Sequence, residues 1–210
     1  EYSFTGNNAN WNVAANWSGN VLPGAGDTGE IAGSPGSPRT AYFNANLAGP
    51  PDAIRIQPNG RLRLNASMTT EHNLIMEGGE ICAFANYYPS STIFMRSDSY
   101  FWRTGSDSMV LSGVVMDYGA EAGRLIVTNG AIMLSNNANS YSGGTRLAGG
   151  RAVATQNNSF GTGPVEVLPG GALHFHQHIT LGNTIILDGG SLHATANYSL
   201  FSTNNLKSDS

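Results

Sequence analysis

A short pattern recurs along most of this chain and constrains its fold more than any other feature. Each copy has a few apolar residues, a turn that ends on a glycine, and a second short apolar run, as in 74–81, 125–132 and 185–192. With Asp98 in place of one glycine, the turn positions are 60, 79, 98, 113, 130, 150, 171 and 190, and their successive differences are 19, 19, 15, 17, 20, 21 and 19. A period of about 20 residues predicts a repeat architecture.

The residue types decide which repeat architecture fits. A helical repeat needs apolar residues at helical spacing among good helix formers, whereas these runs alternate and lie among Gly, Asn, Ser and Thr. The fixed leucine ladder of leucine-rich repeats is absent from the sequence, and a propeller blade needs about 40 residues or more. We therefore expect an all-β fold, a right-handed parallel β-helix of about eight coils.

Two sets of positions predict continuous columns of inward-facing side chains. Two residues after each turn position stands an apolar or aromatic residue, which we expect to stack within one sheet: Leu62, Ile81, Tyr100, Val115, Ile132, Ala152, Leu173 and Leu192. A second column precedes the turn: Met76, Met95, Val110, Val127, Leu147 and Leu187, with Ile56 and Val167 displaced by one residue. This register predicts that Tyr100 points inward and Phe101 outward.

The first 50 residues do not carry the repeat and contain Trp11 and Trp17. A solenoid exposes an apolar cross-section at its end unless a segment covers it. We therefore expect residues 1–50 to be an N-terminal capping segment and residues 51–210 to be the repeats of a single β-helix domain. The two tryptophans would cover the first coil, or alternatively stack on sugar rings.

One stretch resembles a known family, the autotransporter-associated β-strand repeat. The resemblance lies in Asn139-x-Tyr141-x-Gly143-x-Thr145-x-Leu147-x-x-Gly150, then Phe160-Gly161-x-Gly163-x-Val165-x-Val167 and Gly171-x-Leu173. The opening pattern Trp11, Asn16-Trp17, Pro23 and Asp27 is similar to the segment that often begins such regions. Arg151-Ala152-Val153 departs from the family, which usually has Thr-Leu there. The resemblance implies an extracellular, passenger-type parallel β-helix of a large secreted bacterial protein, and it implies no catalytic residues.

Composition excludes several classes of partner. Charged residues make up only 11% of the chain, the net charge is −4, and Lys207 is the single lysine. Without a basic stripe we expect no nucleic-acid partner. No apolar run approaches the roughly 20 residues of a membrane span, so we expect no membrane insertion. Low charge with abundant Gly, Asn, Ser and Thr favours a secreted or cell-surface protein.

The single cysteine and the histidines bear on metal and redox chemistry. Cys82 cannot form an internal disulfide, and we expect it to face outward or into a turn, as an inert residue or a reactive thiol. His174, His176 and His178 alternate, and His193 has the same offset from its turn as His174, so stacked coils would bring these two about 5 Å apart. No Cys, Asp or Glu falls in this strand, so we expect a solvated face rather than a metal site, and no cofactor.

The aromatic residues concentrate in the least regular segment, 82–108. Some of this aromatic area should reach the surface, either as packing of a bulged coil or as a ligand site. If a ligand binds, we expect a carbohydrate held against Tyr87, Tyr88 or Trp102, with Arg103 donating hydrogen bonds to its hydroxyls.

Catalysis is not expected from this sequence. Glycosidases need two carboxylates about 5 to 10 Å apart, and the 14 acidic residues are scattered, with Glu77 and Glu80 expected to be solvated in a turn. We therefore expect a non-catalytic structural or adhesive module of an extracellular or cell-surface protein or fibre. The alternative is a carbohydrate-binding module of a polysaccharide-processing surface protein.

The C-terminal end of the solenoid is the expected assembly surface. Leu200, Phe201 and Leu206 continue the apolar pattern without a capping segment. An uncapped end presents unpaired strand backbone. We therefore expect it to stack on adjoining repeats or on another protein subunit, in a contact that can propagate into a fibre.

Overall fold

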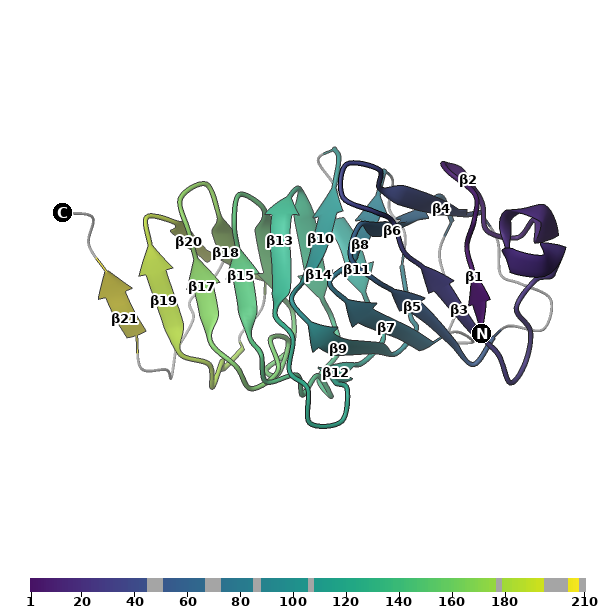
Figure 1. The fold of residues 1–210 in the computed structure, drawn as a ribbon. Helices are drawn as coiled ribbons and strands as arrows, with labels where there is room; N and C mark the ends of the chain where they lie inside the picture. The colour runs from purple at the N-terminus through teal and green to yellow at the C-terminus, as the bar shows by residue number, and fades with distance from the viewer. Residues whose placement is uncertain are drawn as a thin grey trace.

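The structure is a computed structural model that describes residues 1–44, 51–66, 73–84, 88–105, 108–176 and 179–194, and the backbone of 204–207. In this part of the chain the regular structure is short β-strands and two single 3₁₀ turns, η1 (Ala14–Asn16) and η2 (Ser18–Asn20). The strands stack in parallel as a β-solenoid of about seven turns, which confirms the expected fold class with about one coil fewer. The molecule is elongated, with β1 and β21 at opposite ends (Figure 1).

Three parallel sheets, which we name A, B and C, form the walls of the solenoid. Sheet A has six strands: β1 (Tyr2–Ser3), β3 (Thr28–Ile31), β5 (Ala53–Ile56), β7 (Asn73–Glu77), β9 (Ile93–Ser97) and β12 (Val115–Asp117). Sheet B has ten: β2 (Ala9–Asn10), β4 (Arg39–Phe43), β6 (Gly60–Leu64), β8 (Glu80–Ala83), β10 (Ser99–Arg103), β13 (Leu125–Asn129), β15 (Thr145–Leu147), β17 (Val165–Val167), β19 (Ile185–Asp188) and β21 (Asn204–Lys207). Sheet C has five: β11 (Ser108–Leu111), β14 (Ala131–Leu134), β16 (Arg151–Ala154), β18 (Ala172–Phe175) and β20 (Ser191–Ala194).

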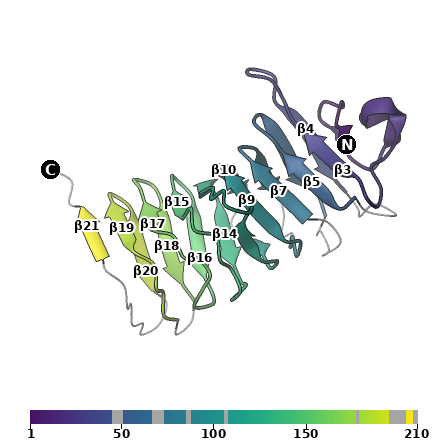
Figure 2. The ribbon, with the colours of Figure 1, turned by 60° about the horizontal axis from the view of Figure 1, so that its bottom comes forward.

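Sheet B runs along the whole described solenoid, whereas sheets A and C each serve one half. Two consecutive coils, β9–β10–β11 and β12–β13–β14, contribute a strand to all three sheets. Before them the regular coils use sheets A and B, and after them they use sheets B and C. Figure 2 shows strands β3 to β9 along one half of the long axis and strands β14 to β20 along the other.

The predicted single column of inward residues is therefore wrong. Leu62 and Ile81 lie in sheet B, Val115 lies in sheet A, and Ile132 and Leu173 lie in sheet C. Turn positions 60, 79 and 98 join sheet A to B, position 113 joins C to A, and positions 130, 150, 171 and 190 join B to C. The second column is divided in the same way, between sheet A, sheet B and, at Val110, sheet C. The inward orientation predicted for Val110 is wrong, because the buried residues of β11 are Met109 and Leu111.

The two short intervals of the repeat, from 98 to 113 and from 113 to 130, have a structural explanation. Each interval contains strands of only two of the three sheets, β10 and β11 in the first and β12 and β13 in the second. The turn positions at its two ends therefore lie at different corners of the solenoid. The strand register shows that the full coils are longer than these intervals, since Ile93 pairs with Val115 and Phe101 pairs with Val127.

The orientations predicted for Tyr100 and Phe101 are reversed. Phe101 is buried and pairs with inward Ile81, whereas Tyr100 is exposed. The cause is a bulge between β7 and β9, where Met76 pairs with Met95 but the next residue, Glu77, pairs with Ser97. One extra residue before the turn shifts β10 by one position, which moves every side chain to the other face.

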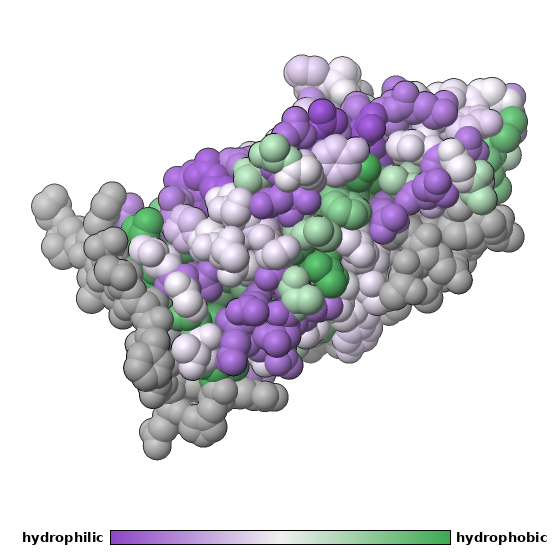
Figure 3. All heavy atoms as spheres, turned by 90° about the horizontal axis from the view of Figure 1, so that it is seen from below, coloured by the Kyte–Doolittle hydropathy of each residue, from purple (hydrophilic) through white to green (hydrophobic). Residues whose placement is uncertain are grey.

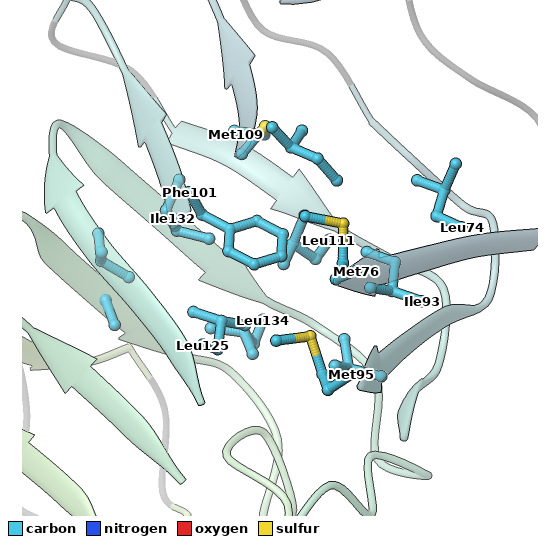
Figure 4. Packing of buried hydrophobic residues seen from close by; sticks show 14 of the residues in the cluster. Leu74, Met76, Ile93, Met95, Phe101, Met109, Leu111, Leu125, Ile132 and Leu134 are labelled. Atoms are coloured by element: carbon cyan, nitrogen blue, oxygen red, sulfur yellow. The ribbon is translucent and has the colours of Figure 1, made fainter. Parts of the chain in front are cut away.

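The core lies where the inner faces of the sheets meet. Side chains from sheet A (Leu74, Met76, Ile93 and Met95), sheet B (Phe101 and Leu125) and sheet C (Met109, Leu111, Ile132 and Leu134) point toward one another in the middle of the solenoid (Figure 4). All of them are fully buried. Flexible methionines suit the place where the sheets change, because they fill irregular gaps.

The first coils enclose their own aromatic core. Trp11 and Trp17 are buried with Phe4, and the Trp17 indole donates a hydrogen bond of 2.6 Å to the Trp11 carbonyl oxygen. Their burial matches the covering role and contradicts a sugar platform made of these two rings. Strands β1 to β4 of this segment pair with the following strands of sheets A and B, so the sheets already begin within it.

Candidate functional site

The outward face of sheet B carries arginines between aromatic rings in its first half. The strand register aligns Tyr42, Arg63, Cys82 and Trp102 across four neighbouring strands. The Arg63 guanidinium lies 5.1 Å from the Tyr42 ring centre and 3.9 Å from that of Phe84. Both distances are in the range of cation–π contacts.

The same cluster continues toward the glycine turns. The Phe84 and Trp102 rings pack edge to face with centres 5.5 Å apart, and the Arg61 guanidinium lies 5.4 Å from the Trp102 ring centre. We call Tyr42, Arg61, Arg63, Phe84 and Trp102 the aromatic–arginine strip. It combines flat apolar area with fixed hydrogen-bond donors.

A groove of about 330 Å³ runs beside the strip, along the turns that join sheet A to sheet B. Its lining consists of Pro38, Pro58, Asn59, Gly60, Arg61, Gly78, Gly79, Glu80 and Tyr100. Arg61 Nε and Nη2 donate to Glu80 Oε2 at 3.0 and 2.9 Å, and Tyr100 is 43% exposed. We call this the A–B groove.

The sequence-predicted site residues do not form one cluster. Trp102 belongs to the strip, and Tyr88 is 48% exposed. Arg103 is only 2% exposed, because it alternates with Trp102 and lies on the buried side of β10, which argues against a contact with a surface sugar. Tyr87 lies outside the described residues, as do His178, Leu200 and Phe201, and the side chain of Leu206 is not described.

Cys82 faces outward in the register, as the sequence predicts, but neighbouring side chains bury it fully. Arg63 and Trp102 occupy the aligned positions on the flanking strands. Burial raises the pKa of the Cys82 thiol to about 12, with a smaller contribution from Glu80. The thiolate is the reactive form, so this residue is an inert part of the packing beneath the strip.

A network of ion pairs crosses the outward face of sheet A and contains Glu1, Glu30, Arg55, Gln57, Glu77, Arg96 and Glu121. Arg55 contacts Glu1 at 2.9 Å, Glu30 at 3.0 Å and Glu77 at 3.2 Å. The expectation that Glu77 and Glu80 are solvated is wrong, because both are largely buried and paired with arginines.

This network links neighbouring coils of sheet A. Burial, followed by the hydrogen bond to Glu1, raises the pKa of Glu30, and the nearby Arg55 opposes that rise. Gln57 Nε2 also donates to Glu30 at 3.1 Å. The carboxylates thus connect neighbouring coils through arginine and amide groups.

The histidines of sheet C stack as the repeat offset predicts. The His174 and His193 ring centres are 4.5 Å apart with 27° between the ring planes. The pKa of His174 is lowered to about 4, mainly by partial burial. Smaller contributions come from the nearby Arg151, His193 and His176. Within the described ranges, no group of three or more His, Cys, Asp or Glu side chains is suitably placed to hold a metal ion.

A second groove, of about 380 Å³, follows the turns that join sheet B to sheet C. It is lined by Gly105, Gly130, Ala131, Gly149, Gly150, Arg151, Gly170 and Ala172. It resembles the A–B groove in its glycines but has no aromatic ring in its lining. We call it the B–C groove, and it provides an internal comparison for the first.

The residues of the A–B groove left a signal in the sequence that the apolar repeat alone did not reveal. Arg61 and Glu80 each follow a turn position directly, so opposite charges occupy equivalent places in successive copies of the repeat. Equivalent places in successive coils lie side by side, which predicts the ion pair. Tyr100 could not be assigned in this way, because the bulge before it changes the register.

The described surface in Figure 3 mixes polar and apolar residues. On the described part of the face in Figure 3, hydrophobic residues form small groups among hydrophilic ones. In the described part of the chain, no helix is long and apolar enough to span a membrane. Comparisons with protein-family models, with curated proteins and with solved structures found no match.

Proposed function

We propose that this chain is a non-catalytic structural or adhesive module of a large secreted or cell-surface bacterial protein, of the autotransporter-associated repeat type. The observation that carries the proposal is sheet B, whose ten parallel strands run the whole length of the described solenoid. A continuous sheet with cross-coil links makes a stiff rod, which suits a spacer or a display scaffold.

Polar side chains support this role because they link one coil to the next. Asn10 ends β2, and Asn44 and Asn65 directly follow β4 and β6. Asn44 donates to Asn10 at 2.5 Å and Asn65 donates to Asn44 at 2.8 Å. Between the two middle coils, Arg124 binds Asp98 through the backbone N–H at 2.9 Å and through Nη2 at 2.7 Å. Such ladders stabilise stacked coils and fix their register.

The motif residues behind the family resemblance also have structural contacts. Asn139 is buried, accepts a hydrogen bond from the Val115 backbone N–H at 2.9 Å and donates to the Ser159 carbonyl at 2.8 Å. The buried Tyr141 hydroxyl lies 2.7 Å from Thr145 Oγ1. These polar groups hold three coils together, which supports a structural reading of the motif.

The end of the solenoid near β20 and β21 supports assembly with other repeats or subunits. Leu192 is 37% exposed, although the aligned Leu173 in the preceding coil is fully buried. Among the described strands, β20 pairs with β18 and β21 pairs with β19, and neither has a neighbour on its outer side. A further coil stacked on this end would cover Leu192 and pair both strand edges.

The experiment is light scattering and electron microscopy of the 210-residue chain over a concentration series. We expect end-to-end association that Leu192→Glu weakens, whereas Tyr88→Glu, at an exposed residue between β8 and β9 and away from both ends, leaves it unchanged. A strictly monomeric wild type at high concentration would contradict the assembly proposal, as would equal effects of the two substitutions.

A second candidate function is carbohydrate binding. The observation that favours it is the aromatic–arginine strip beside the A–B groove, because sugar sites combine aromatic faces with a few fixed polar groups. A module with this activity would belong to a polysaccharide-processing surface protein. It would use the solenoid as a support.

A further inference from the structure

We propose that the A–B groove is a binding site for a short segment of a neutral polysaccharide, with Tyr100 as the stacking ring and the Arg61–Glu80 pair as the hydroxyl-binding group. This site differs from the cluster that the sequence suggested around Tyr87, Tyr88, Trp102 and Arg103. It develops the second candidate function, and the structural proposal stands whether or not the groove binds a sugar.

The floor of the groove lets a ligand approach the backbone closely. Gly60, Gly78 and Gly79 present no side chains, and Pro38 and Pro58 border them with flat apolar rings. Gly78 has a positive φ of 93°, and Gly79 has no room for a Cβ, which would lie 2.4 Å from Ile56 Cγ2. The solenoid therefore requires this bare surface, and a ligand finds it preformed.

The walls provide both kinds of contact that a sugar ring needs. The exposed Tyr100 ring can lie against the C–H face of a pyranose, and its hydroxyl can bond a neighbouring sugar. Arg61 is fixed on two sides, by Glu80 and by the Trp102 ring. Both Arg61 hydrogen bonds go to Glu80 Oε2, which leaves the role of acceptor for a sugar hydroxyl to Oε1.

The charge of the groove favours a neutral ligand. Arg61 and Glu80 are the charged residues in its lining, and they neutralise each other. An anionic sugar would gain from Arg61 but be repelled by Glu80, in a chain with a net charge of −4. A volume of about 330 Å³ is at the small end of ligand sites, which fits a short stretch of a longer chain lying across the turns.

The B–C groove lacks two lining features that the A–B groove has, an aromatic ring and a carboxylate. It has similar volume and more glycines, and Arg151 is the charged residue in its lining. Without an aromatic ring or a carboxylate partner it lacks the stacking surface and the neutral donor–acceptor pair. We expect binding at the A–B groove alone.

The test uses the whole 210-residue chain with cellohexaose, xylohexaose and mannohexaose as neutral probes, and an oligogalacturonate as the acidic probe, in calorimetric titrations. We expect at least one neutral probe to bind. Tyr100→Ala should weaken that binding by about tenfold or more, whereas Tyr100→Phe keeps the ring and most of the affinity.

Two controls separate this site from folding effects and from the sequence-predicted cluster. Melting temperatures of the variants should match the wild type, because Tyr100 is an exposed residue. Tyr88→Ala removes another exposed tyrosine and should leave binding unchanged. The proposal is overturned if none of the neutral probes binds, if only oligogalacturonate binds, or if Tyr88→Ala abolishes binding that Tyr100→Ala preserves.

Discussion

Single residues in this chain owe their properties to the coil above and the coil below. Arg63 is held between Tyr42 and Phe84, which belong to the preceding and following coils. Cys82, aligned with Arg63, is inert because the strip buries it. Because charged and aromatic side chains recur at equivalent places, each contact links two coils and adds to the stacking free energy.

The lowered pKa of His174 makes the free energy of unfolding depend on pH. Its folded-state pKa is lowered to about 4, whereas an exposed histidine has a pKa of 6.5. Below pH 6.5 the unfolded chain therefore binds more protons, and the free energy of unfolding falls as the pH is lowered toward 4. Burial is the largest cause of the lowered pKa of His174, and the positive charges of Arg151, His193 and His176 lower it further.

We expect His174→Gln to remove part of the acid sensitivity between about pH 7 and pH 5. Because the ring is partly exposed, the difference should be about 1 kcal/mol rather than the full value of the pKa shift. Urea denaturation of both proteins at the two pH values measures it. Parallel losses of stability in wild type and variant would show that His174 does not contribute.

At the scale of strands and turns, sequence alone predicted the local unit but not its place on the solenoid. The strand, glycine and strand of each copy form as expected, for example at β7–β8 and β15–β16. The same strand–glycine–strand pattern forms the turn between sheets A and B in the first half and the turn between sheets B and C in the second half. Its residues predict that the chain bends there, but they do not predict which two sheets the bend joins. The two short intervals on either side of position 113 were the visible sign of the change.

The residues of the candidate site could be predicted from the sequence only where the strand register could also be predicted. Trp102 was placed on the right stretch, but its neighbours Arg61 and Phe84 come from other coils. Tyr100 and Phe101 exchanged faces because a single bulge residue cannot be recognised from local sequence. The buried position of Arg103 follows from the same shift.

The glycine pair Gly78–Gly79, in the turn between β7 and β8, gives a prediction about the packing of neighbouring coils. A Cβ at Gly79 would lie 2.4 Å from Ile56 Cγ2 and 2.7 Å from the Gln57 carbonyl oxygen, both in the neighbouring coil. Gly79→Ala should therefore lower the free energy of unfolding by about 1 to 3 kcal/mol.

Gly36→Ala is the matched control for this substitution. Gly36 has a positive φ of 77°, but an added Cβ would meet nothing within 4 Å, so alanine there should cost only about 1 kcal/mol through backbone strain. Chemical denaturation of the two variants compares them directly. A smaller loss for Gly79→Ala than for Gly36→Ala would contradict the close packing of coils at the turns.

The whole molecule depends on one continuous wall, sheet B, with a change of partner sheet in the middle. The change places the two glycine grooves at opposite edges of sheet B, one in each half. Only the first of them meets aromatic side chains. The position of the proposed sugar site thus follows from the architecture of the whole solenoid.

Disulfide mapping tests this architecture most directly. Phe94 and Met116 pair in sheet A, and Val110 and Met133 pair in sheet C, with all four side chains partly exposed. Aligned residues of neighbouring strands lie about 5 Å apart, within the reach of a disulfide. A single uninterrupted column would instead align Met116 with Met133, which the structure assigns to different sheets.

The measurement is the yield of each disulfide, by mass spectrometry of peptides after mild oxidation, in three double-cysteine variants. The three-sheet architecture predicts efficient bonds in Phe94→Cys with Met116→Cys and in Val110→Cys with Met133→Cys, and none in Met116→Cys with Met133→Cys. An efficient bond in the third variant together with no bond in the first two would contradict it.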